Sequence, residues 1–145
     1  MAAIFNSPSK YIQGPDELAK LGSYVEPLGA KALVIVTPSG KKRVGAKIEG
    51  GFAEAKAELL FEDFNGECSK GEVDRLVALA RDSGCDIIVG VGGGKILDTA
   101  KAVAYYLESP VIICPTIAST DAPCSALSVL YTDDGQFDKY LFLKA

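Results

Sequence analysis

The sequence contains no histidine, so it lacks the side chain that proteins use most often as a general base and as a metal ligand. It also lacks a C-x-x-C pair, although it has four cysteines: Cys68, Cys85, Cys114 and Cys124. A zinc site would need ligands gathered from these scattered places. We therefore expect reduced thiols, as in a cytosolic protein, and no metal site in this chain.

Blocks of like charge and long apolar stretches are missing too. The net charge is −4 and no basic block exceeds Lys41–Arg43, which argues against a nucleic-acid partner. Without an apolar stretch of about 18 residues or a leader pattern, the chain is expected to be soluble, cytoplasmic and free of membrane contacts. Its 145 residues, 48% of them hydrophobic, predict one domain over residues 1–145.

Short apolar runs alternate with helical patterns along most of the chain. Strands are predicted at Lys31–Val36, Ala57–Phe61, Asp86–Gly90 and Val111–Cys114. Helices are predicted at Pro15–Gly29, Lys42–Phe52, Ser69–Gly84 and Leu97–Leu107, the third with a capping box. This alternation predicts an α/β fold, a Rossmann-like parallel sheet with helices on both faces. Such sheets bind ligands at the carboxyl ends of their strands.

The last part of the chain follows a different pattern. Two apolar segments, Leu127–Thr132 and Phe137–Leu143, flank the turn sequence Asp133–Gln136. An Asp-Gly turn between such segments is typical of a β-hairpin. We therefore expect a C-terminal β-hairpin after the parallel sheet.

The glycine-rich segment Gly90–Asp98 carries the strongest functional signal. A strand that turns through glycines into a helix leaves the first helical amides free, and these amides attract a phosphate. Neither standard motif fits, because Lys95 replaces the last glycine of the dinucleotide fingerprint and Ile96 replaces the Ser or Thr of a Walker A loop. The free amides still predict an anion site, to which Lys95 adds a positive charge. The alternative is a plain turn with a solvated lysine.

A second polar cluster follows the strand Val111–Cys114. Thr116, Ser119 and Thr120 supply three hydroxyls, and Asp121 supplies a carboxylate. Hydroxyls can bind phosphate or ribose, and a carboxylate can accept hydrogen bonds from a polyol. The same residue types also begin helices, so a helix N-cap is the alternative interpretation.

Together these segments resemble the glycerol dehydrogenases, which belong to the iron-type (group III) polyol and alcohol dehydrogenases. The matching segments are Ser7–Gly14, Gly66–Ser69, Gly90–Ala102 and Pro115–Tyr131, so the resemblance spans nearly the whole chain. It implies reversible oxidation of glycerol to dihydroxyacetone with NAD, assisted by a divalent metal that is commonly zinc. It also implies an N-terminal nucleotide-binding domain, a C-terminal helical domain, and an active site between the two.

The resemblance also implies roles for single residues. The implied cofactor-binding residues are Gly92, Gly93, Gly94, Lys95, Ile96, Leu97 and Asp98 around the pyrophosphate loop, Thr116, Ile117, Ala118 and Ser119 in a second segment, and Ser125, Leu127 and Tyr131 on the nicotinamide side. Asp121 looks like the residue that contacts the glycerol hydroxyls.

The sequence departs from the family pattern at three points. Members that use NAD typically carry an Asp after the first buried strand, where this chain has Thr37. The loss of that carboxylate, with Lys41–Arg43 just beyond, makes NADP an alternative cofactor. Ile96 replaces a frequent family Thr. The family holds its metal with an Asp and two His of the helical domain, so we expect this chain to be the cofactor half and to lack full activity alone.

Two further interpretations remain open. The chain can be a nucleotide-binding or regulatory module that forms a homo-oligomer or associates with a full-length subunit or a helical-domain partner. Apolar surfaces at Val129, Leu130 and Tyr140–Leu143 would favour such association. The ligand can also be a phosphorylated sugar, as in related sugar-cyclising synthases of similar fold, although the match at Ser119–Asp121 argues against it.

Overall fold

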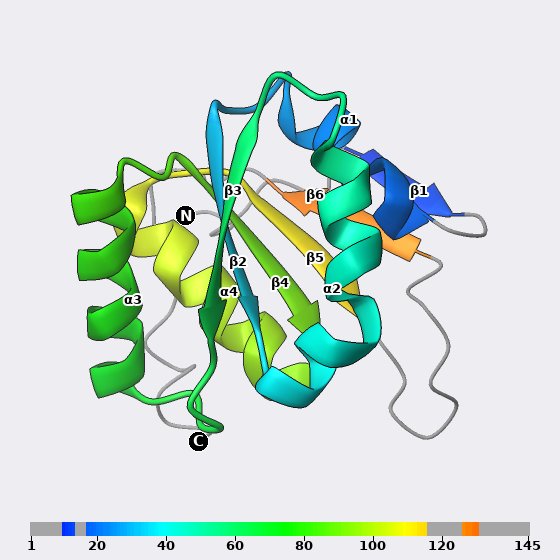
Figure 1. The fold of residues 1–145 in the computed structure, drawn as a ribbon. Helices are drawn as coiled ribbons and strands as arrows, with labels where there is room; N and C mark the ends of the chain where they lie inside the picture. The colour runs from blue at the N-terminus through cyan, green and yellow to red at the C-terminus, as the bar shows by residue number, and fades with distance from the viewer. Residues whose placement is uncertain (1–9, 14–16, 116–125, 131–145) are drawn as a thin grey trace.

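The computed structural model describes residues 10–13, 17–115 and 126–130 of the chain. In chain order the elements are β1 (Lys10–Gln13), the 3-10 helix η1 (Glu17–Lys20), α1 (Leu21–Val25), β2 (Lys31–Val36), α2 (Pro38–Phe52), β3 (Glu58–Asp63), α3 (Lys70–Ser83), β4 (Ile87–Gly92), α4 (Gly94–Leu107), β5 (Val111–Pro115) and β6 (Ala126–Leu130). The strands of this described part form one sheet in the order β1-β6-β5-β4-β2-β3 (Figure 1).

The predicted Rossmann-like α/β fold is confirmed. Strands β3, β2, β4 and β5 run parallel, while β6 and β1 continue the sheet in antiparallel pairing. Helices α1 and α2 cover one face of the sheet, and α3 and α4 cover the other (Figure 1). Within the described residues, every helix is too short or too polar to span a lipid bilayer.

Alternation along the central strands divides the core into two layers. Val34 of β2 and Val89 of β4 pack toward α1 and α2, and both are fully buried. Their chain neighbours Leu33 and Ile88 pack toward α3 and α4 and are also fully buried. A strand buried on both faces needs a continuous apolar run rather than an alternating one. The run Lys31–Val36 was predicted as a strand on this pattern, and its bounds agree with β2.

Helix boundaries differ from the sequence prediction at several points. The first predicted helix is a 3-10 turn followed by the short α1, which ends at Val25. Helix α2 begins at Pro38 rather than Lys42, because Thr37 accepts a hydrogen bond from the Gly40 amide and so caps the helix. Helix α4 begins at Gly94, three residues before the predicted start. Helix α3 starts after Ser69 and ends at Gly84, as predicted.

Strand β6 pairs differently from the predicted hairpin. Residues 126–130 form a strand, but β6 lies between β5 and β1, and both neighbours run antiparallel to it. The predicted second hairpin strand, Phe137–Leu143, and the turn before it lie outside the described residues. Over its described length β6 is therefore an inner strand, not an exposed edge.

The strand order of the parallel sheet reverses between β2 and β4. From β2 the chain crosses to β3 on one side, and from β4 it crosses to β5 on the other side. The loops after β2 and β4 therefore diverge at the carboxyl edge of the sheet. Such a switch point opens a crevice in which α/β proteins bind ligands.

Candidate functional site

A groove of about 270 Å³ lies at this switch point. Its lining residues come from the loops that follow β2, β3 and β4: Thr37, Phe64, Gly66, Gly93, Gly94, Lys95 and Ile96. Four of them belong to the glycine-rich segment on which the phosphate prediction rests. A second hollow of about 370 Å³ lies at the other end of α2, beside Gly50 and Ala55, and contains no predicted site residue.

The N-terminus of α4 opens into the groove without a side-chain cap. Gly93 is the N-cap residue and makes no capping hydrogen bond through a side chain. The first backbone hydrogen bond of the helix runs from the Leu97 amide to the Gly93 carbonyl, at 3.0 Å. The amides of the first turn before Leu97 are consequently available to an acceptor, and the helix dipole favours an anionic one.

Two glycines bring α4 close to β4 and leave room in front of it. A Cβ atom on Gly90 would lie 2.6 Å from the Ala100 Cβ atom, so the strand and the helix pack in direct contact there. Gly92 has a φ of +147°, which L residues rarely adopt, and it turns the chain toward the helix. A Cβ atom on Gly93 or Gly94 would have no atom within 4 Å. The space in front of these two residues is therefore open to a ligand.

Lys95 lies at the mouth of the groove and is not simply solvated. Its Nζ atom donates at 3.0 Å to Oε2 of Glu67, which belongs to the loop that follows β3. Both side chains are about two-thirds exposed, at 64% and 69%. An ion pair this exposed contributes little to stability, so a bound anion can replace Glu67 as the partner of Lys95.

The other predicted residues of this segment lie differently. Ile96 lines the groove but is 4% exposed, and its Cδ1 atom packs under Gly92. Leu97 packs against the core on the α3 and α4 side, and its amide is already bonded within the helix. Asp98 is half-buried and does not line the groove. The contacts of Leu97 and Asp98 with a cofactor thus remain predictions.

The second predicted segment lies largely beyond the described part of the chain. The residues concerned are Thr116, Ile117, Ala118, Ser119, Asp121, Ser125 and Tyr131. Leu127 belongs to β6, where its backbone pairs with Ile12. The segment follows Pro115, which ends β5 in register with Gly92 at the end of β4. The chain therefore enters it from the same edge of the sheet as the groove.

Thr37 lines the groove and caps α2. Its Oγ1 atom accepts from the Gly40 amide at 3.0 Å and lies 3.4 Å from Ser39 Oγ. The first turn of α2 contains no acidic residue. The Lys41 ammonium lies 4.9 Å from the centre of the Phe61 ring on β3. The first turn of α2 therefore brings no carboxylate to the groove.

Sequence reasoning assigned no role to the loop between β3 and α3. Phe64 and Gly66 line the groove, and Glu67 reaches Lys95. The sequence did contain a signal for this loop, because β3 was predicted as a strand. In a parallel sheet its carboxyl end lies at the same edge as the carboxyl end of β2. In the structure Asp63 pairs with Val36, which places the following loop against Thr37.

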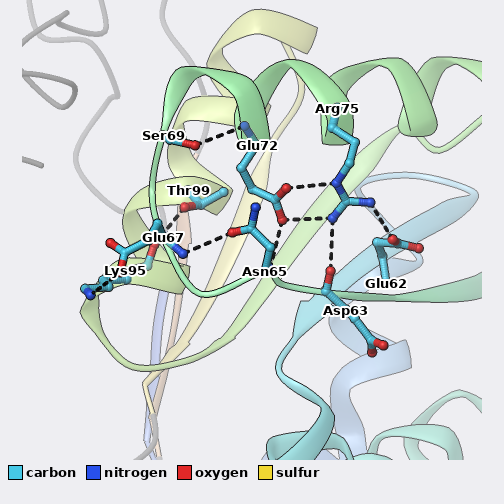
Figure 2. Close-up of polar contacts among 9 residues, drawn as sticks. All are labelled: Glu62, Asp63, Asn65, Glu67, Ser69, Glu72, Arg75, Lys95 and Thr99. Carbon is cyan, nitrogen blue, oxygen red and sulfur yellow. Dashed lines mark hydrogen bonds and ion pairs between the residues drawn. The ribbon is translucent and has the colours of Figure 1, made fainter.

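Behind this loop, Glu72 and Arg75 of α3 form a polar network (Figure 2). Arg75 donates from Nε and Nη2 to the two Glu72 carboxylate oxygens, at 2.8 Å each. The hydrogen bonds from Arg75 lower the pKa of Glu72 although burial opposes them, and the bonds to Glu72 and Glu62 raise the pKa of Arg75. Both groups are therefore charged at neutral pH.

The described residues contain no group of three or more His, Cys, Asp or Glu side chains placed to hold a metal ion. Cys68, Cys85 and Cys114 are buried and form no disulfide among the described residues, and Cys124 lies outside them. Burial raises the pKa of the Cys85 thiol, which keeps it protonated.

Comparison with known proteins identifies the family. The family model for iron-containing alcohol dehydrogenases matches residues 8–145. The chain belongs to this family. It is 51% identical to a glycerol dehydrogenase of Escherichia coli O6:H1 and 54% identical to one of Pseudomonas putida, and each alignment covers 99% of this chain and 39% of the relative. The chain thus spans about two-fifths of the length of these curated iron-containing alcohol dehydrogenase relatives.

Solved structures of the family share the fold. A probable glycerol dehydrogenase from Sinorhizobium meliloti 1021 superposes with a TM-score of 0.69 at 44% identity, over 85% of this chain and 33% of that one. The glycerol dehydrogenase of Schizosaccharomyces pombe also gives a TM-score of 0.69, at 33% identity. The resemblance that four sequence segments suggested is therefore confirmed at the level of the family.

Proposed function

We propose that this chain is the cofactor-binding part of a dehydrogenase that oxidises glycerol or a similar small polyol with NAD. The observation that carries the proposal is the groove at the switch point, into which the uncapped N-terminus of α4 opens beside Lys95. Relatives at about half identity are named glycerol dehydrogenases, which supports the same activity here. The reaction proposed is the reversible conversion of glycerol to dihydroxyacetone.

The described residues fit the pyrophosphate of a dinucleotide. The open space in front of Gly93 and Gly94 lets phosphate oxygens approach the backbone amides. Lys95 supplies a positive charge once Glu67 releases it. When bound, NAD supplies the hydride acceptor of the reaction. We propose that Thr116–Ser119, Ser125, Leu127 and Tyr131 complete the cofactor site.

We further propose that Asp121 contacts the polyol hydroxyls and that this chain alone turns over little. The chain contains no histidine, and its described residues offer no metal cluster to polarise the alcohol oxygen. Incubation of the chain with NAD, glycerol and zinc should therefore give little or no NADH, measured by absorbance. Robust turnover would overturn the second part of this proposal.

The nature of the dinucleotide depends on Thr37. Its hydroxyl already caps α2, and the first turn of that helix offers no carboxylate to repel a 2′-phosphate. We propose NAD as the cofactor, with NADP as the competing outcome. Equilibrium titrations with NADH and NADPH, followed by the fluorescence of the reduced nicotinamide, separate the two. Equal or tighter binding of NADPH would overturn the choice of NAD as the cofactor.

A further inference from the structure

The loop from Phe64 to Ser69 forms one wall of the groove, opposite the N-terminus of α4. Its first residue is fixed to the sheet, because the Phe64 amide donates to the Val36 carbonyl at 2.9 Å. Inside the loop the Asn65 side chain accepts from the Glu67 amide at 3.0 Å. The first of these contacts joins only Phe64 to the sheet, and the second lies within the loop, so neither attaches the residues after Phe64 to the rest of the protein.

Glu72 makes that connection from the first turn of α3. Its Oε2 atom accepts from the Asn65 amide at 3.0 Å, and its side chain is 1% exposed. A buried carboxylate destabilises a protein unless its charge is paired. Here the two oxygens receive a bidentate contact from Arg75, so the charge is compensated at the point where it binds the loop.

Arg75 joins the same carboxylate to the end of β3. Its Nη1 atom donates to Glu62 Oε2 at 2.6 Å, and Nη2 donates to the Asp63 carbonyl at 3.0 Å. Figure 2 shows the guanidinium between Glu72 on one side and the Glu62 and Asp63 groups on the other. Glu62 and Asp63 at the end of β3, and Asn65 in the loop, are thus all bonded to Glu72 or Arg75 in the first part of α3.

This arrangement exceeds what is needed to start α3. Ser69 already caps the helix, since its Oγ atom accepts from the Glu72 amide at 3.2 Å. In a capping box the Glu side chain would return to the amide of the cap residue, but here it takes the amide of Asn65. Neither Glu72 nor Arg75 lines the groove. Any effect they have on a ligand must therefore pass through the loop.

We infer that Glu72, held by Arg75, is a positioning residue. It fixes the loop from Phe64 to Ser69 as a wall of the groove and thereby sets nucleotide affinity. The inference rests on the proposed function, because it takes the groove to be a nucleotide site. Without the Glu72 contact the loop samples other positions, and only the fraction in the ordered position binds. The exposed pair between Glu67 and Lys95 is too weak to replace that contact.

The experiment compares Glu72→Gln and Arg75→Lys with the unchanged 145-residue chain, using ADP as the probe in titration calorimetry. Glutamine cannot pair with the guanidinium as a carboxylate does, and the single ammonium of lysine cannot span the four acceptor atoms that Arg75 reaches on Glu72, Glu62 and Asp63. We expect the ADP dissociation constant to rise about tenfold, as it would if the ordered loop fell to about a tenth of the population. Hydrogen exchange at the Asn65 and Glu67 amides should accelerate in both variants without ligand.

Two controls separate positioning from stability. Asp74→Asn removes a charge from the exposed Lys70–Asp74 pair on the same helix and should leave ADP affinity unchanged. Leu79→Ala weakens packing of α3 against the core without touching the network. All titrations are run well below each unfolding transition, so that only folded chain is compared. Arg75→Lys keeps a cation beside Glu72 and remains informative if Glu72→Gln does not fold.

The outcomes distinguish the inference from the proposed function. If the unchanged chain binds ADP and both network variants bind it equally well, the inference is wrong while the proposed function stands. Equal weakening by Leu79→Ala would also overturn the inference, because general destabilisation would then explain the loss. If the unchanged chain binds no ADP, the proposed function fails and the inference falls with it.

Discussion

At the scale of single residues, the proposed phosphate site would make Glu67 and the ligand compete for Lys95. The two side chains meet at 3.0 Å beside the groove, and both are largely exposed. A ligand phosphate must therefore displace one carboxylate before it can take the ammonium. Under the proposed function, this pair and the free amides at the α4 N-terminus together set the electrostatic potential at the groove, so removal of Glu67 should alter affinity.

Glu67→Gln should tighten the binding of ADP, because it frees Lys95 without disturbing the Asn65 contact behind the loop. The expected gain is up to about fivefold, the equivalent of an exposed ion pair. Titration calorimetry at low salt measures it, with Glu49→Gln on the exposed face of α2 as a control for the change in net charge. Weaker binding by Glu67→Gln would show that the carboxylate helps to bind the ligand instead.

Glu72 should also shape the acid stability of the chain. Its pKa lies below the usual 4.5 in the folded state, chiefly because Arg75 donates to it. Above about 4.5 the carboxylate is ionised in both states and its full contribution to stability is present. As the pH falls further, the unfolded chain takes up the proton first, so the contribution is lost progressively until the pH reaches the lower folded pKa.

Denaturant unfolding at several pH values measures this effect. The free energy of unfolding of the unchanged chain should fall more steeply below pH 4.5 than that of Glu72→Gln, which has no proton to bind there. Parallel slopes for the two proteins would mean that Glu72 is not preferentially ionised in the folded state.

At the scale of elements, two glycines in the turn from β4 into α4 are expected to have different roles: Gly90 in folding stability and Gly93 in ligand binding. Gly90→Ala would place a Cβ atom 2.6 Å from the Ala100 Cβ and push the helix from the strand. We expect a loss of about 1–3 kcal/mol in the free energy of unfolding. Gly93→Ala has open space and a φ of −93°, so it should cost less than about 1 kcal/mol.

The same pair of variants should rank in the opposite order for ligand binding. Gly93→Ala fills the space in front of the helical amides and should weaken ADP binding in calorimetry. Gly90→Ala, measured where it remains folded, should weaken binding less because its added atom faces the helix and not the groove. If Gly93→Ala binds ADP like the unchanged chain, the phosphate does not approach this turn.

The central parallel strands were predictable from sequence because each buried strand is a continuous apolar run, whereas the short strand β1 was not predicted. The bounds of Lys31–Val36 needed no knowledge of its neighbours. Helix starts were less predictable, since α2 depends on the Thr37 cap and α4 begins on a glycine of low intrinsic helix propensity. The loop from Phe64 to Ser69 was missed although the predicted strand before it pointed to this edge, because its position beside Thr37 depends on the pairing of Val36 with Asp63, a contact between distant parts of the chain.

At the scale of the whole molecule, the order of the strands explains why residues from separate parts of the sequence line one groove. The loops after β2, β3 and β4 share the carboxyl edge of the sheet because these strands are parallel, and the opposite crossovers from β2 and β4 open the groove between them. The chain spans about two-fifths of the length of its curated relatives. The cofactor part of the proposed activity can therefore be tested on this chain independently of turnover.

The most direct measurement is titration calorimetry of the 145-residue chain with NAD, repeated with Gly93→Ala. The account predicts saturable binding with one site, competition by ADP, and weaker binding by the variant. No heat of binding from the folded chain at millimolar NAD, or equal affinity for the variant, would contradict the claim that the amides of the α4 N-terminus bind the pyrophosphate.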